Sequence, residues 1–230
     1  MKKIFWIVMA AMVMAQPMAA QNYRQSKYYN QKTGHLDYGF GVGNENYCGV
    51  RLGPAFSTVN SDMEALDGNK THTGLNVGVV LGTSLSNSVP LYLESGLYYI
   101  EKGGKKKVID RNSEDYGTKI VYNLNYLQVP IMVKYKIDID GDFSVQPMAG
   151  GYLAMGVGGK IKNYATRQVR SSFTSDNFRR FDGGIRLGCG VAYDLFYADL
   201  SWDIGLANVC HDSFDSSHTS SVQLNFGVNF

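Results

Sequence analysis

The sequence predicts an all-β fold, an eight-stranded antiparallel up-and-down β-barrel of the transmembrane type. Three observations indicate it: apolar and polar residues alternate in eight segments, the connections alternate in length, and glycine collects on the polar face. The 230 residues include 26 glycines and 16 tyrosines but five prolines, which favours closely packed strands. No helical periodicity of useful length follows the first twenty residues.

The N-terminus predicts a secretory signal peptide. Two lysines precede an apolar run that ends at Ala15, and two alanines follow. The run is shorter than the ~20 residues that a helix needs to cross a bilayer, which disfavours an uncleaved anchor. We expect residues 1–20 to be removed near Gln21, residues 21–46 to form a flexible polar lead-in, and residues 47–230 to form the barrel.

Period-two alternation defines the expected strands, because successive side chains of a strand point to opposite faces. The segments run over Tyr47–Ser57, Thr73–Leu85, Leu91–Lys102, Tyr122–Ile137, Phe143–Val157, Arg180–Tyr193, Phe196–Leu206 and Ser220–Phe230. In the second, fourth, seventh and eighth segments the apolar positions are Leu75, Val77, Val79, Leu81 and Leu85; Leu127, Val129, Ile131, Val133, Tyr135 and Ile137; Phe196, Ala198, Leu200, Trp202, Ile204 and Leu206; and Val222, Leu224, Phe226, Val228 and Phe230.

The connections predict the plan of an outer-membrane barrel. Those after the second, fourth and sixth segments are the short stretches Ser86–Pro90, Asp138–Asp142 and Asp194–Leu195. The other four are expected to run to about a dozen residues or more. Short turns on one side and long loops on the other are typical of outer-membrane barrels.

The polar face indicates which side is the interior. A soluble lipocalin-type barrel has an apolar interior, and its water-facing side is normally filled with Lys, Glu and Thr. Here that face carries glycines, which suit the narrow interior of an eight-stranded barrel. We therefore expect the apolar face to contact lipid. The glycines are Gly49, Gly53, Gly74, Gly78, Gly82, Gly96, Gly150, Gly156, Gly184, Gly188, Gly190, Gly205 and Gly227.

Charged residues on the inward face are expected to pair within the lumen, because an isolated buried charge is costly. A two-residue turn at Asp194–Leu195 would place Arg186 opposite Asp203, and Glu94 can lie near Lys134. Inward tyrosines should fill the remaining space, so we expect no open pore. The predicted lumen network, balanced in charge, is Arg51, Glu94, Lys134, Lys136, Asp182, Arg186, Asp199 and Asp203.

Aromatic residues are expected at both membrane interfaces. The last strand must pair with the first, because an open edge cannot exist in lipid. The expected girdles are Tyr135, Phe143, Tyr193, Phe196 and Phe230 on the short-turn side, and Phe56, Tyr99 and Phe181 on the long-loop side.

Five stretches resemble, in order, the PorT-like outer-membrane β-barrel family of Bacteroidetes: "YCGVRLGPAFST", "LYLESGLYYIEKG", "NYLQVPIMVKYKI", "RRFDGGIRLGCGVAYD" and "ADLSWDIGLANV". The resemblance covers about residues 47–230. It implies a barrel in the outer membrane of a Gram-negative bacterium and little about activity. The C-terminal strand, with Phe226, Val228 and Phe230, resembles the signal that barrel-assembly machinery reads for membrane insertion.

The sequence predicts no catalytic residue, no cofactor and no metal site. The rim residues His72, His211, His218, Asp212, Asp215, Ser213 and Ser217 fit no spacing that can be tied to a mechanism. Cys48, Cys189 and Cys210 match neither a disulfide framework nor a metal-binding pattern. Without the two signal-peptide lysines, 20 of the 22 basic residues remain against 20 acidic ones, so no global field attracts nucleic acid.

The expected role is a non-enzymatic structural or binding platform that presents its long loops outside the cell. The alternatives are a component of an envelope or protein-secretion assembly and a rim-located lipid A-modifying enzyme. Expected partners are the bilayer, the assembly machinery, an envelope protein and lipopolysaccharide. Lipopolysaccharide would meet the basic outer residues Lys105, Lys106, Lys107, Arg167, Arg170, Arg179 and Arg180.

Overall fold

The computed structural model describes most of the chain from residue 46 onward. The described ranges are 46–61, 68–86, 89–107, 119–140, 143–164, 167–173, 178–209 and 217–230. The predicted signal peptide and lead-in lie outside them. Within these ranges there is no helix long and apolar enough to span a membrane.

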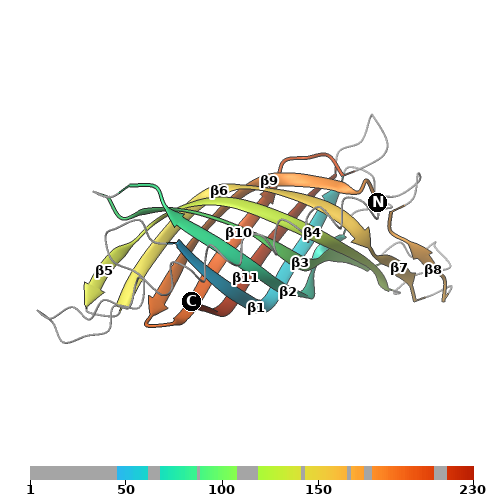
Figure 1. Cartoon of the computed structure of the whole chain (residues 1–230). Helices are drawn as coiled ribbons and strands as arrows, with labels where there is room; N and C mark the ends of the chain where they lie inside the picture. Colours follow the sequence, from blue (N-terminus) through green and yellow to red (C-terminus); the bar gives the residue numbers. More distant parts are fainter. Residues whose placement is uncertain are drawn as a thin grey trace, which may run out of the picture.

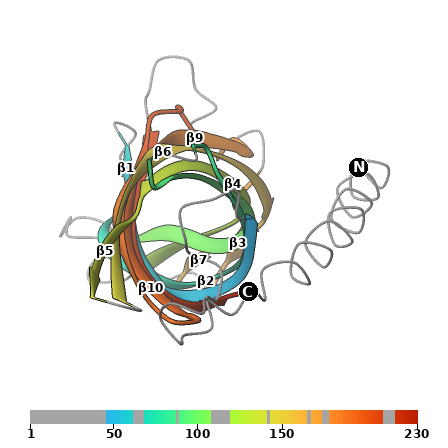
Figure 2. The same ribbon diagram turned by 60° about the vertical axis from the view of Figure 1, so that its left-hand side comes forward.

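Eight long antiparallel strands form a closed barrel (Figures 1 and 2). Each pairs with its neighbours in the sequence, and pairing of the first with the last closes the ring. The predicted fold class is confirmed. The strands are β1 (Asn46–Ser61), β2 (Gly68–Ser84), β3 (Leu91–Lys107), β4 (Lys119–Tyr135), β6 (Phe143–Gly158), β9 (Phe181–Tyr193), β10 (Phe196–Gly205) and β11 (Ser217–Asn229).

Three short strands, absent from the sequence-based prediction, extend the barrel at its two ends. β5 (Ile137–Asp140) pairs with β6, and β7 (Lys160–Asn163) pairs with both β4 and β8 (Val169–Ser171). Figure 1 shows β5 at one end of the barrel and the β7–β8 hairpin at the other. On the β7–β8 side, β1, β2, β3, β4 and β11 run three to five residues further than expected, whereas β9 and β10 do not. The first long connection is therefore residues 62–67, shorter than the predicted dozen.

The two faces of the wall differ as the alternation predicts. On β4, Ile131 and Val133 are 53% and 42% exposed, whereas Met132 and Lys134 are buried. Exposed aliphatic and aromatic residues recur on every long strand except β3, whose outward Leu93, Leu97 and Tyr99 are partly exposed, and together they form an apolar outer surface. A soluble monomer rarely exposes such a surface.

The interior is less polar than predicted. Apolar side chains also point inward, and most of them lie toward the long-loop end, where residues from the connections cover them. The glycines, polar residues and tyrosines that the sequence predicts for this face share it with aliphatic side chains, because a lumen that is closed to water can also be filled with apolar groups. The inward apolar residues include Ala55, Val59, Val80, Ile100, Leu124, Met132 and Met148.

Several inward glycines are explained by an aromatic ring on the neighbouring strand. Gly78 of β2 is paired with Tyr98 of β3, and a Cβ atom at Gly78 would lie 2.5 Å from Tyr98 Cδ1. Gly82 is paired with Tyr47 in the same way, and a Cβ there would overlap the phenol ring. Each glycine therefore leaves the space that a buried tyrosine occupies.

The seam between β1 and β11 depends on the last residue of the chain. Cys48 N donates to Phe230 O (3.1 Å), and Phe230 N donates to Cys48 O (2.7 Å). Inside the barrel, Arg51 Nη2 donates to Asn229 Oδ1 (2.5 Å) and Arg51 Nη1 to Val228 O (3.2 Å). Backbone and side-chain bonds thus join the two ends of the sheet.

Candidate functional site: the lumen and the outer rim

All eight residues of the predicted lumen network are buried. Alternation places them on the inward face of their strands, where neighbouring strands bring opposite charges together. Seven of them belong to two clusters along the barrel, and Lys136 pairs separately with Asp138.

The first cluster surrounds Glu94. Its Oε2 accepts from Tyr47 Oη (2.6 Å) and Lys134 Nζ (2.7 Å), and Arg51 Nη2 lies 3.7 Å away. Lys134 Nζ also donates to Tyr197 Oη (2.8 Å), whose ring lies 4.0 Å from Arg51 Cζ. Two cations therefore share one carboxylate, with cation–π contact to the tyrosine as additional stabilisation.

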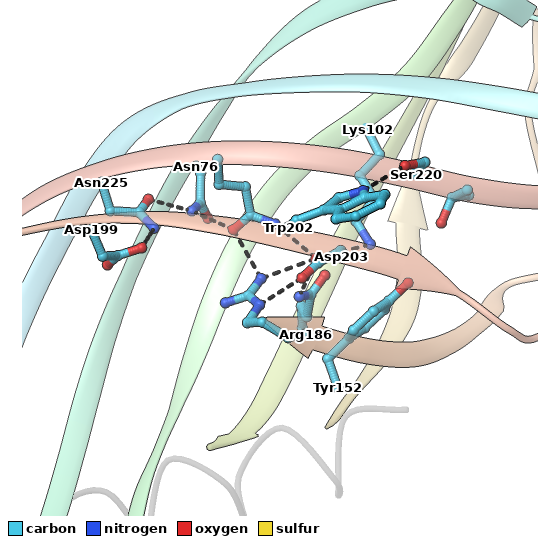
Figure 3. Close-up of polar contacts among 12 residues, drawn as sticks. Asn76, Lys102, Tyr152, Arg186, Asp199, Trp202, Asp203, Ser220 and Asn225 are labelled. Atoms are coloured by element: carbon cyan, nitrogen blue, oxygen red, sulfur yellow. Dashed lines mark hydrogen bonds and ion pairs between the residues drawn. The ribbon is translucent and has the colours of Figure 1, made fainter. Parts of the chain in front are cut away.

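The second cluster surrounds Asp203 (Figure 3). Arg186 donates to it twice, from Nε to Oδ1 (2.6 Å) and from Nη2 to Oδ2 (3.0 Å), in the bidentate arrangement that favours an arginine–carboxylate pair. Gln128 Nε2 and Gln223 Nε2 donate to the same Oδ2 at 2.9 and 2.7 Å. The carboxylate is thus fully enclosed by donors.

A chain of amides links this cluster to Asp199. Gln223 Oε1 accepts from Arg186 and from Asn76 Nδ2 (3.0 Å), and Asn76 Nδ2 also donates to Asn225 Oδ1 (2.7 Å). Asn225 Nδ2 then donates to Asp199 Oδ1 (3.0 Å), as Figure 3 shows. Uncharged amides carry the network across the lumen without adding unpaired charge.

Lys102 is a lumen residue that the sequence analysis missed. Its Nζ donates to Asp182 Oδ2 (3.2 Å) and lies 3.4 Å from Asp203 Oδ2. Thr219 Oγ1 donates to the same Asp182 oxygen (2.8 Å). Lys102 follows Glu94 by eight positions on the same alternating face, and this spacing was the available signal.

Lys102 changes the predicted charge balance of the lumen. Five buried cations stand beside four buried carboxylates, instead of four beside four. Lys136 Nζ forms an ion pair outside this set, with Oδ1 of the half-exposed Asp138 at 3.1 Å, near the short-turn rim. Within the rest of the lumen the described charges balance at four and four.

An apolar cap closes the lumen at the long-loop end. Phe173, Phe178 and Val209 lie in the connections and are buried against inward residues of the strands. The rings of Phe173 and Tyr126 meet edge-on with their centroids 5.5 Å apart, and those of Phe178 and Tyr122 with their centroids 6.0 Å apart. The connections of a barrel show no periodicity, so the burial of these three residues could not be predicted from alternation.

The rim residues considered for catalysis are only partly described. His72 lies on β2 and His218 on β11, while His211, Asp212, Ser213 and Asp215 are outside the described residues. Ser217 is buried, and its Oγ shares a hydrogen bond with Ser61 Oγ at 2.5 Å. In the described part of the chain, no group of three His, Cys, Asp or Glu residues could hold a metal ion.

These features define a class of protein. A closed antiparallel barrel with an apolar outer surface and a filled, charged interior is the architecture of a small outer-membrane β-barrel protein. A family model described as outer membrane protein beta-barrel domain matches residues 19–210. The chain belongs to this family, and membership implies that it resides in the outer membrane.

Solved structures of bacterial surface proteins are similar to this chain at low sequence identity. Ail, the attachment invasion locus protein of Yersinia pestis, shares 17% identity with a TM-score of 0.41, covering 81% of this chain and 99% of Ail. Neisserial surface protein A shares 13% (TM-score 0.44; 80% and 95% covered), and OprG from Pseudomonas aeruginosa shares 9% (0.45; 81% and 97%). No curated protein matches the sequence.

Proposed function

We propose that the protein is a non-enzymatic outer-membrane platform that presents its long-loop end to ligands or partners at the cell surface. The observation that carries this proposal is the filled lumen. Paired charges occupy its length, and the cap of Phe173, Phe178 and Val209 covers its outer end, which leaves the outer surface as the part available for binding.

Planar bilayer recording and lipid A analysis test this proposal together. We expect no porin-like conductance, because the lumen is plugged, and an unchanged lipid A mass spectrum when the gene is deleted. Steady porin-like conductance would contradict the platform role in favour of a channel. A changed lipid A mass spectrum would favour the alternative of a rim-located lipid-modifying enzyme.

The proposal includes export and assembly in a Gram-negative bacterium. Residues 1–20 act as a signal peptide that is cleaved near Gln21, and residues 21–46 form a polar lead-in. Phe226, Val228 and Phe230 are then read by the barrel-assembly machinery. The five stretches that resemble the PorT-like family support an origin in Bacteroidetes, and Phe226 and Phe230 are exposed on the outer face.

A second candidate role is a component of an envelope or secretion assembly. The β5 strand at the short-turn end supports it, because β5 pairs only with β6 among the described strands and Ile139 is 62% exposed. A pull-down from solubilised outer membranes, with a tag within residues 22–46, would recover an envelope protein in this case. Recovery of the chain without a partner favours the platform alone.

A further inference from the structure

Outward-facing lysines gather on the barrel wall at the long-loop end. Lys70, Lys119, Lys160 and Lys162 are exposed, and Lys105 is partly buried. They come from β2, β3, β4 and β7, four strands that lie side by side. We call Lys70, Lys105, Lys119, Lys160 and Lys162 the lysine face.

Strand register places three of these lysines in one row. At an irregularity of β2, both Asn69 and Lys70 are opposite Lys105; Lys105 is opposite Val121, and Val121 is opposite Lys162. The row crosses four strands, and only its position on β4 is uncharged. Neighbouring strands are about 4.8 Å apart, which brings the lysines of β2 and β3 close together. Like charges directly opposite each other destabilise a sheet pair. The positions of this row include no carboxylate that could offset the repulsion.

The row points sideways from the barrel. In the adjacent register position, Tyr122 is opposite Ile161; Tyr122 is buried in the core and Ile161 packs against it. Since side chains alternate between faces, Val121 and Lys162 point away from the lumen. The lysine ammonium groups of this row therefore face the molecules that lie beside the barrel.

The described residues supply no anionic partner to the lysine face. None of its five lysines forms a salt bridge with a carboxylate of the described ranges, where the ion-paired carboxylates Glu94, Asp138, Asp182 and Asp203 bind other cations. Glu101 lies nearer the membrane on β3, and its Oε2 accepts from Leu75 N (3.2 Å). That carboxylate completes the backbone bonding at a β2 irregularity.

The lysine face stands above the expected outer interface. Lys105 follows the girdle residue Tyr99 by six positions on β3. Six residues span about 20 Å along a strand, and the usual barrel tilt reduces this to about 15 Å along the membrane normal. At this height the neighbours of an outer-leaflet protein are lipid-linked sugars rather than acyl chains.

We propose that the lysine face binds phosphate groups on the core sugars of neighbouring lipopolysaccharide molecules. A phosphate dianion can bridge two lysines of the row and relieve their repulsion. The sideways direction favours a lipid-anchored ligand, because a soluble polyanion would first meet the loop tips. This inference rests on the proposed function, since it requires the long-loop end to lie outside the cell.

The test measures binding of purified rough-type lipopolysaccharide to the full-length folded protein in detergent-free nanodiscs. We expect the Lys70→Gln, Lys105→Gln and Lys162→Gln triple variant to bind about fivefold more weakly per lysine, on the order of 100-fold in all. The matched Arg triple variant keeps the charge and should bind like the wild type. Heat-modifiable migration in gels verifies that each variant is folded.

Two further arms identify the ligand chemistry. Dephosphorylated lipopolysaccharide should bind the wild type as weakly as the intact lipid binds the Gln variant. Equal binding by the Gln and Arg variants would overturn the proposal, as would full binding of the dephosphorylated lipid or tighter binding of a soluble sulfated oligosaccharide. Mass spectra of the recovered lipid separate the two ways in which the account can fail. Chemical modification of lipid A would contradict the proposed non-enzymatic function, whereas unmodified lipid with weak binding would contradict the lysine-face proposal alone.

Discussion

At the scale of single residues, the lumen depends on complete pairing of buried charges. Asp203 accepts hydrogen bonds from Arg186, Gln128 and Gln223, and Lys102 lies within ion-pair distance. Removing one partner of a buried pair leaves an uncompensated charge, which costs much more than the pair contributes. Asp203 is therefore the residue on which the central cluster most depends.

We predict that Asp203→Asn lowers the free energy of unfolding by about 3–5 kcal/mol, because Arg186 keeps its charge and loses its partner. Asp138→Asn is the matched control, since the Lys136–Asp138 pair has a half-exposed carboxylate and should contribute less than about 1 kcal/mol. Urea titration in lipid vesicles measures both values. Equal effects of the two substitutions would contradict the network.

Individual residues also show where sequence reasoning ends. Arg186 and Asp203 could be placed together because a two-residue turn fixes the register. Lys102 is the last residue of an expected segment. The alternation that places Glu94 on the inward face also places Lys102 there, so its inward direction could have been predicted. Phe173 and Phe178 could not be predicted, since their burial depends on how a connection folds back over the lumen.

At the scale of strands, the membrane-spanning alternation predicted all eight elements but not their full lengths. In lipid, one face must be apolar and the other must fit the lumen, so the sequence carries a period of two. Beyond the membrane both faces can be polar, as in the "GGKKK" end of β3, and the period disappears. The β7–β8 hairpin was not predicted for the same reason: beyond the membrane its strands need no period of two.

The close approach of β2 to the Tyr98 ring of β3 predicts that a side chain at Gly78 hinders folding. We expect Gly78→Val to lower the yield of folded barrel strongly, because the new side chain overlaps Tyr98 and a Cβ alone would lie 2.8 Å from Leu97 O. Gly158→Val is the control, since a Cβ at Gly158 meets no atom within 4 Å. The folded fraction is read from gel mobility without heating. Similar folded fractions for the two variants would refute the packing argument.

The closing strand predicts a requirement for an aromatic residue at position 230. Phe230→Ser should reduce the amount of folded protein in the membrane, because the exposed Phe230 ring lies at the expected interface beside the β1–β11 seam. Phe230→Tyr keeps an interfacial aromatic ring and should assemble normally. Quantitative blotting of outer-membrane fractions measures both. A wild-type level of Phe230→Ser would show that assembly does not need the ring.

At the scale of the whole molecule, the barrel is inverted relative to a soluble one. Its largest apolar surface faces outward, and its charges lie inside, paired and covered by an apolar cap. This arrangement is stable only where the outer surface is removed from water. The fold class followed from the sequence for that reason, while the cap and the short added strands required the three-dimensional structure.

Trp202 provides the most direct test of this account. Of the two tryptophans in the sequence, Trp6 lies in the predicted signal peptide, so in a chain that begins at Gln21 all tryptophan fluorescence comes from Trp202. Trp202 is 48% exposed on the outer face of β10. In vesicles we expect brominated acyl chains to quench its fluorescence strongly and aqueous acrylamide to have little effect. Strong quenching by acrylamide with none by the brominated lipids would contradict a lipid-facing outer wall.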